Sequence, residues 1–186
     1  VMVVGPSGVG KSSLVTAGLF PALLRTEKWA TVSFRPGETP FNALAMALYE
    51  LEPSDQQPSL DDLDNRAQRI RKHGFTELAS TLSVLLKGKR ILLHIDQFEE
   101  LFAACPDKER ALFLDQILPS GDADNAACRL VCTLRADFLA PVLAYPGLGP
   151  RLQDRLLPIS PMGKEALERA ITEPGRARGV TYDEGL

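Results

Sequence analysis

The stretch GPSGVGKSS, from Gly5 to Ser13, constrains the fold of this chain more than any other segment. It satisfies the pattern G-x-x-x-x-G-K-[ST], follows a short β-branched apolar run and precedes a segment with helical character. Glycines let a backbone curl so that several N–H groups point inward around one phosphate chain. A helix that begins near Lys11 directs its positive end to the same place. The stretch therefore predicts a strand–loop–helix unit that binds phosphate.

The whole loop is a candidate nucleotide contact. Lys11 is expected to supply a point charge for the outer phosphates, and the Ser12 hydroxyl can coordinate magnesium. ATP with Mg²⁺ is the predicted ligand pair. No Asn-Lys-x-Asp guanine reader occurs in the chain, so GTP is disfavoured. The predicted nucleotide-binding residues are Gly5, Pro6, Ser7, Gly8, Val9, Gly10, Lys11, Ser12 and Ser13.

A carboxylate for the metal is expected at Asp96, in the stretch HIDQFEEL that closes an apolar β run. Magnesium is usually held by one or two carboxylates together with substrate phosphate, and a single Asp at a strand end suits that need. The 85 positions between Lys11 and Asp96 leave room for another strand between the two motif strands. Ser12 and Asp96 are therefore the predicted metal ligands. The alternative is an Asp that caps the next helix.

Hydrolysis needs a group that orients or deprotonates water, and the residue directly after Asp96 is Gln97, a poor base. Glu99 and Glu100 are the remaining candidates, with a slight preference for Glu100. Their alternative role is that of acids in the first turn of a helix.

Arg135, which ends the run RLVCTLR, is a further catalytic candidate. The carboxyl ends of parallel strands face the ligand, so an arginine there can reach a γ-phosphate. A salt bridge, for instance with Asp137, is the alternative. His94 lies within its strand and is expected to be a packed histidine rather than a catalyst.

Composition narrows the remaining classes. The 186 residues are 45% hydrophobic and 24% charged with a formal net charge of −3, so a nucleic-acid partner is not expected. The basic run from Arg66 to Lys72 is interpreted as a solvated helix face. Cys128 and Cys132 are expected to be buried thiols in a reducing compartment. No apolar stretch is long enough to cross a bilayer and no signal peptide is visible, which favours a cytoplasmic protein.

Strand-like and helix-like segments alternate along the chain, which predicts an α/β fold with a mainly parallel sheet of about five strands and helices on both faces. The expected strands are residues 1–4, 30–37, 90–96, 129–135 and a weak one at 156–159. Helices are expected from Lys11 to about Gly18 or Pro21, and at 40–51, 61–73, 75–87, 106–118 and 163–174. Residues 1–160 are assigned to one core that is truncated at its N-terminal side. Residues 161–186 are assigned to the start of a helical lid or winged-helix region.

Five stretches resemble, in order, the bacterial novel STAND NTPases, signal-transduction ATPases related to the NACHT and apoptotic ATPases. They are GPSGVGKSSLVTAGLFPAL, RPGETPFNALAMAL, HIDQFEELF, TLRADFL and RLLPISPMGKEALERAI. The resemblance implies a P-loop NTPase three-layer sandwich with Walker A at Gly5–Ser13, Walker B at Asp96 and a sensor arginine at Arg135. It also places the acids of the NACHT-type extended motif on Glu99 and Glu100.

The resemblance implies an ATP-driven regulatory switch with slow hydrolysis, whose nucleotide state controls conformation and self-association. Protein partners and flanking sensor repeats are expected in such proteins. The alternatives are a remodelling ATPase of the AAA type, a small-molecule kinase and a scaffold whose nucleotide is never turned over. An AAA-type enzyme would favour a polar strand-four sensor instead of Arg135, and a kinase would need an acceptor site.

Overall fold

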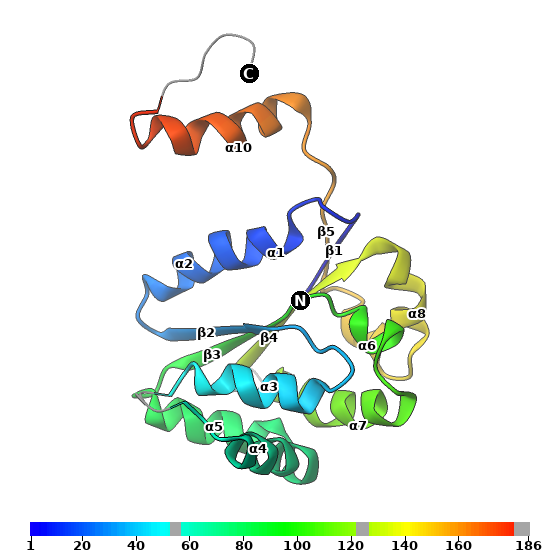
Figure 1. Cartoon of the computed structure of the whole chain (residues 1–186). Coiled ribbons are helices and arrows are strands. Elements are labelled where there is room, and N and C mark those ends of the chain that lie inside the picture. Colours follow the sequence, from blue (N-terminus) through cyan, green and yellow to red (C-terminus); the bar gives the residue numbers. More distant parts are fainter. Residues whose placement is uncertain (53–56, 122–126, 181–186) are drawn as a thin grey trace.

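Five parallel strands form one sheet in the order β2-β3-β4-β1-β5 (Figure 1). The computed structural model describes residues 1–52, 57–121 and 127–180. The strands are β1 (Met2–Gly5), β2 (Trp29–Phe34), β3 (Arg90–Ile95), β4 (Cys128–Arg135) and β5 (Leu156–Pro158). This confirms the predicted parallel α/β sheet. It also confirms that the two motif strands are not adjacent, because β4 lies between β1 and β3.

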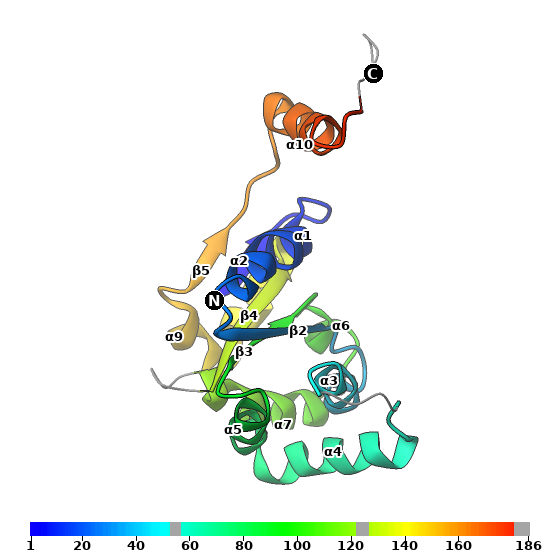
Figure 2. The same ribbon diagram turned by 90° about the vertical axis from the view of Figure 1, so that its left-hand side faces the viewer.

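Helices cover both faces of this sheet and make the predicted three layers (Figures 1 and 2). One face carries α3 (Pro40–Tyr49), α5 (Phe75–Leu85) and α7 (Asp107–Ile117), with α4 (Leu60–His73) packed outside α3 and α7. The opposite face carries one long helical segment made of α1 (Lys11–Ser13), a π-helical stretch (Leu14–Leu19) and α2 (Phe20–Leu24).

This long segment differs from the prediction, since Gly18 and Pro21 do not end it. Helical hydrogen bonding passes from π to α at Phe20, and Pro21 lies in the first turn of α2. Proline lacks the N–H that an uninterrupted α-helix would use, and the change from π to α hydrogen bonding at Phe20 coincides with the position where that donor is missing. The result is a continuous helix that starts at the phosphate loop and crosses the sheet.

The core is divided unequally between the two faces. Side chains alternate along each strand, so Ile91, Leu93 and Ile95 of β3 point into the large cluster under α3, α5 and α7. Leu92 points the other way, into a small cluster with Val15 of the π-helical stretch. The larger cluster supplies most of the apolar burial.

The basic run on α4 is only partly solvated, contrary to the prediction. Arg66 pairs with Glu52 at 2.5 Å, and Arg71 makes a two-pronged contact with Glu109 at 2.5 and 2.7 Å. Both arginines are half-buried and lie over aromatic rings of α3. These two arginines therefore hold α4 to the rest of the fold.

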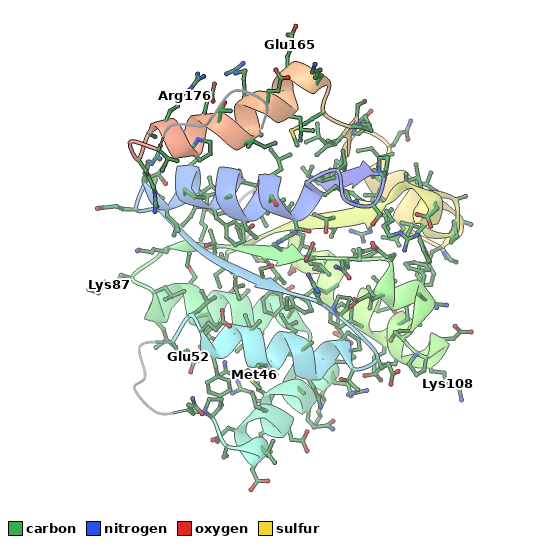
Figure 3. The ribbon with its side chains drawn as sticks, turned by 45° about the horizontal axis from the view of Figure 1, so that its top comes forward. Met46, Glu52, Lys87, Lys108, Glu165 and Arg176 are labelled. Atoms are coloured by element: carbon green, nitrogen blue, oxygen red, sulfur yellow. The ribbon has the colours of Figure 1, made fainter. Side chains whose placement is uncertain are left out.

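Short helices complete the chain. They are α6 (Glu100–Ala103), α8 (Leu139–Ala144), α9 (Leu148–Leu152) and 3-10 turns at Leu118–Gly121 and Ala136–Phe138. Proline or glycine interrupts the sequence pattern of some of them, such as α8 and α9. The last helix, α10 (Lys164–Arg176), stands apart from the sheet (Figures 1 and 2), and Glu165 and Arg176 lie near its two ends (Figure 3). Within the described part of the chain, no helix has the length and apolarity needed to cross a membrane.

Candidate nucleotide site

The phosphate loop between β1 and α1 depends on its glycines. Gly8 and Gly10 have φ angles of 76° and 91°, and a Cβ built on either would meet nothing within 4 Å. Only glycine adopts these angles without strain, and the space beside the loop is open. A Cβ on Gly5 would lie 2.7 Å from the Ile159 carbonyl oxygen, because β5 passes close behind the loop. The loop therefore has the open backbone cradle that the sequence pattern predicts.

Lys11 is the first residue of the helix and its side chain turns back over the loop. Its Nζ donates hydrogen bonds to the carbonyl oxygens of Gly5 at 2.9 Å and Pro6 at 2.7 Å. These carbonyls orient the ammonium group at the edge of the cradle. The charge is thus held where an anion in the cradle would meet it.

Asp96 follows β3 directly and is joined to the phosphate loop. Ser12 Oγ donates to Asp96 Oδ1 at 2.5 Å, and Thr133 Oγ1 of β4 donates to the same oxygen at 2.7 Å. Arg35 Nε, at the end of β2, donates to Asp96 Oδ2 at 3.2 Å. Three elements therefore converge on one carboxylate, and Asp96 as a whole residue is only 6% exposed.

The surroundings of Asp96 favour its ionised form. Burial raises the pKa of this carboxyl, but the hydrogen bonds from Ser12 and Thr133, with the nearby His94 and Arg35, outweigh it and hold the pKa below its usual range. Asp96 is therefore negatively charged at neutral pH and suited to a cation.

His94 lies beneath Asp96 and is fully buried. Its Nδ1 is 2.9 Å from Ser33 Oγ, and its Nε2 is 3.9 Å from Asp96 Oδ1. Burial lowers the pKa of the imidazole and outweighs the opposing effect of Asp96. The ring packs edge-on against Phe20 of α2. The expected packed histidine is confirmed.

The chain turns sharply after Asp96, and this turn brings the two glutamates back to the site. Gln97 has a φ of 55°, an uncommon angle for a residue with a side chain. Thr133 holds the turn, because its hydroxyl accepts from the Gln97 N–H at 3.0 Å and its carbonyl accepts from the Phe98 N–H at 2.8 Å. Helix α6 then begins at Glu100.

Glu99 and Glu100 are held by different strands. Glu99 Oε2 accepts from the Arg135 backbone N–H at 3.2 Å, at the end of β4. Glu100 Oε2 accepts from the Gly37 N–H at 3.0 Å, in the loop after β2. Glu99 is 7% exposed and Glu100 is half-buried. The β4 end is next to the phosphate-loop strand, because Arg135 pairs with Gly5, whereas the β2 end is farther away.

Arg135 reaches the same region from the end of β4 but is engaged with its neighbour. Its Nε and Nη2 atoms lie 3.2 and 2.7 Å from the two carboxylate oxygens of Asp137. The salt bridge that the sequence offered as an alternative is therefore present. Because both side chains are about half exposed, the bridge can exchange with another anion at modest cost.

A cavity of about 500 Å³ joins these groups. It is lined by Ser7, Gly8, Gly10, Lys11, Ser12, Ser13, Gln97, Glu99, Glu100, Ala103, Thr133, Arg135 and Phe138. The predicted residues that do not line it are Gly5, Pro6, Val9 and Asp96. A second cavity of about 410 Å³ is lined by other residues, including Val1, Trp29 and Leu130, and contains none of the predicted ones.

The residues around the larger cavity fit a magnesium-bound nucleotide. The open glycine cradle and the Lys11 ammonium suit phosphate, and the adjoining Ser12 hydroxyl and Asp96 carboxylate suit a hard cation. Bound Mg²⁺ would neutralise charge that develops on the phosphate oxygens. Ser12 and Asp96 are the residues that would hold it.

Two residues that donate to Asp96, Thr133 and Arg35, were not predicted from the sequence. Both side chains lie on the face of the sheet that carries the site. Side chains alternate along a strand, so Ser33 and Arg35 of the β2 segment point toward the long helix, and so does Thr133 of β4. The sequence pattern that could have indicated them is a polar residue at every second position near the carboxyl end of a strand. Knowing which of these polar residues lie next to each other requires the order of the strands in the sheet.

Comparisons with known proteins agree with this geometry. The family model described as Novel STAND NTPase 1 matches residues 1–186. Similar folds occur in the ORC2 protein of Aeropyrum pernix, solved as ADPNP-ADP complexes, with a TM-score of 0.56 and 14% identity over 94% of this chain and 45% of that one. Cdc6p of Pyrobaculum aerophilum has a TM-score of 0.57 and 14% identity over 95% of this chain and 42% of that one.

A Walker-type ATPase of Pyrococcus abyssi has a TM-score of 0.51 and 14% identity, over 98% of this chain and 55% of that one. This chain thus spans about half the length of the structures that it matches. No curated protein matches it in sequence. The structures share the fold, and the family model extends over the whole chain. The chain therefore belongs to the Novel STAND NTPase 1 family and is an NTPase module with the P-loop fold.

Proposed function

We propose that this module binds Mg-ATP in the cavity beside the phosphate loop and hydrolyses it slowly, as the nucleotide switch of a larger signalling protein. The observation that carries the proposal is the 2.5 Å contact between Ser12 Oγ and Asp96 Oδ1. It joins the phosphate loop to the strand-end carboxylate at the point where a phosphate-bound cation needs both. The complexes of the ORC2 protein with ADPNP and ADP favour an adenine nucleotide for this fold.

Water activation is proposed for the pair Glu99 and Glu100, with Glu99 as the better candidate. Its carboxylate is held at the end of β4, next to the strand that leads into the phosphate loop. Glu100 is tied instead to the loop after β2. A carboxylate acts as a general base only within hydrogen-bond reach of the water, so the position next to the phosphates is favoured. The Arg135 guanidinium would leave Asp137 and then contact the γ-phosphate.

The switch role, self-association and contacts with protein partners or sensor repeats are proposed from the family. The proposed core comprises residues 1–160, and residues 161–186 are proposed to begin a helical lid or winged-helix region. The separation of α10 from the sheet supports that division (Figure 2), and residues 181–186 lie outside the described residues. A cytoplasmic location and the lack of a nucleic-acid partner stay predictions.

The proposal is tested by ATP binding and phosphate release measured on the same proteins. Lys11→Ala should abolish ATP binding, because the cradle loses its only lysine. Glu99→Gln should retain binding and lower hydrolysis about 100-fold, the usual scale for losing a general base, while Glu100→Gln should lower it less. Hydrolysis at the wild-type rate in Lys11→Ala would exclude the site.

The rate itself separates the alternatives. Slow turnover supports the switch, whereas fast turnover that depends on ring assembly would indicate a remodelling ATPase. ATP binding with no phosphate release from the full-length parent protein would indicate a scaffold.

A further inference from the structure

Arg35 occupies a position that the proposed reaction does not use. Phe34 of β2 pairs with Ile95 of β3, and the Asp96 N–H donates to the Phe34 carbonyl at 2.8 Å. Residues 35 and 96 therefore leave the sheet side by side. Arg35 Nε reaches Asp96 Oδ2 at 3.2 Å, and its two Nη atoms have no hydrogen-bond partner among the described residues.

The two oxygens of Asp96 have partners of different kinds. Oδ1 accepts from the hydroxyls of Ser12 and Thr133, whereas Oδ2 accepts from the Arg35 guanidinium. The Thr133 side chain is buried, but the Arg35 side chain is 62% exposed beside a carboxylate that is only 9% exposed. Solvent-exposed guanidinium groups exchange partners readily. The contact with Oδ2 is therefore the exchangeable one.

The loop after β2 keeps Arg35 near the site. Its Gly37 N–H donates to Glu100 Oε2 at 3.0 Å, and Glu100 lines the cavity. The loop is thus tied to the two carboxylates Asp96 and Glu100 at positions two residues apart. An Arg35 side chain that leaves Oδ2 stays within reach of it.

We propose that Arg35 is an internal competitor of the divalent cation for Asp96, so that it sets the Mg²⁺ concentration at which the module holds nucleotide. The inference rests on the proposed function, because it assigns the cation to Ser12 and Asp96. A guanidinium and a divalent cation that share one carboxylate repel each other. The cation therefore binds less tightly while the guanidinium holds Oδ2. At low Mg²⁺ the guanidinium neutralises a carboxylate that would otherwise repel phosphate.

The test is equilibrium binding of a fluorescent ADP analogue over a series of Mg²⁺ concentrations, which needs no hydrolysis. Arg35→Gln should reach half of its Mg²⁺-dependent gain in affinity at about fivefold lower Mg²⁺ than the wild type, the scale of an exposed ion pair. It should also bind the analogue more weakly without Mg²⁺. Arg35→Lys keeps the charge and should stay close to the wild type. Arg69→Gln removes an exposed charge from α4 and is the matched control.

Three results would overturn the inference. Equal Mg²⁺ midpoints in the wild type and Arg35→Gln would show that Arg35 does not compete with the cation. A loss of affinity by the same factor at every Mg²⁺ concentration would make Arg35 a phosphate ligand instead. Failure of the wild type to bind the analogue at any Mg²⁺ concentration would remove the proposed function as well. Thermal unfolding followed by circular dichroism checks that the variants fold, and Arg35→Met, which also removes the charge, supplies the midpoint comparison if Arg35→Gln does not fold.

Discussion

The two faces of the sheet differ in what their alternating strand positions carry. On β3, Ile91, Leu93 and Ile95 enter the large core, while the opposite positions run from Leu92 to His94 and on to Asp96. Strand β4 repeats the contrast, with apolar Leu134 on one side and Thr133 on the other. One face is apolar along its whole length. The other becomes polar toward the carboxyl ends of the strands.

Because of this difference, one face of the sheet provides most of the hydrophobic core and the other face provides the polar residues of the candidate site. The apolar face meets α3, α5 and α7 and buries most of the hydrophobic side chains. Among the described residues, the other face meets the long helix that follows the phosphate loop, and Thr133, His94 and Asp96 lie beneath the start of that helix, next to its Ser12. Polar groups can be buried there because they hydrogen-bond to one another, as Ser12 and Thr133 do to Asp96.

The contrast is tested most strongly by Phe113→Ala on α7. Phe113 is fully buried and its ring meets Phe34 and Phe41 edge-on, so its removal should lower the free energy of unfolding by about 3–5 kcal/mol. Urea denaturation gives this value. The matched variant on the other face is Phe20→Ala. Because the Phe20 ring is only half-buried, its removal should lower the free energy of unfolding by a smaller amount. A larger loss for Phe20 than for Phe113 would contradict the unequal division of the core.

Thr133→Val should have a smaller effect that reaches both stability and the site. The change removes the donor to Asp96 and leaves the Gln97 N–H without its acceptor, which should lower the free energy of unfolding by about 1–3 kcal/mol. Binding of Mg-nucleotide should weaken as well. Thr133→Ser keeps the hydroxyl and should preserve nucleotide binding. Equal losses of binding in the two variants would contradict the role assigned to the hydroxyl, because Thr133→Ser retains it.

Acid should expose the smallest of the three effects, through Asp96. Its pKa in the folded chain lies below the ordinary value of 3.8, because the hydroxyl, histidine and arginine contacts outweigh burial. The ionised carboxylate therefore adds stability above that ordinary value, and this contribution is lost as the pH falls through the folded-state pKa.

Urea midpoints between pH 6 and pH 3 measure the effect. The stability difference between the wild type and Asp96→Asn should shrink as the pH falls. The exposed Asp64→Asn on α4 controls for simple loss of charge. Parallel curves for the wild type and Asp96→Asn would show that the carboxylate adds no such stability.

Local patterns carried much of the fold. Alternating β-branched and apolar runs placed the ends of all five strands within three residues of those of β1, β2, β3, β4 and β5, and the largest difference is at the end of β2. The glycine pattern of the phosphate loop predicted the positive φ angles of Gly8 and Gly10, because few other residues adopt them. The prediction that Gly18 or Pro21 ends the first helix was wrong, because the helix continues through both residues with a change in its hydrogen bonding. Helices α8 and α9 were missed because proline and glycine interrupt their patterns.

The residues of the candidate site also fall into two groups, those that the sequence predicted and those that it did not. Residues named by a contiguous motif, such as Lys11, Ser12 and Asp96, could be predicted because their spacing along the chain reflects their chemistry. Thr133 and Arg35 could not, because they reach Asp96 only through the order of strands β2, β3 and β4. The separate tethers of Glu99 and Glu100 also depend on that order.

The amino-acid pattern alone therefore settles that this chain forms a phosphate loop on a parallel sheet, since both follow from local backbone preferences and side-chain alternation. The partners of the Asp96 carboxylate follow only from the packed sheet. Parallel strands are joined by long crossovers, so the residues that donate to the Asp96 carboxylate lie 37 to 84 positions away from Asp96 in the chain. Which strand ends become neighbours is a property of the sheet order, and no short stretch of sequence contains it.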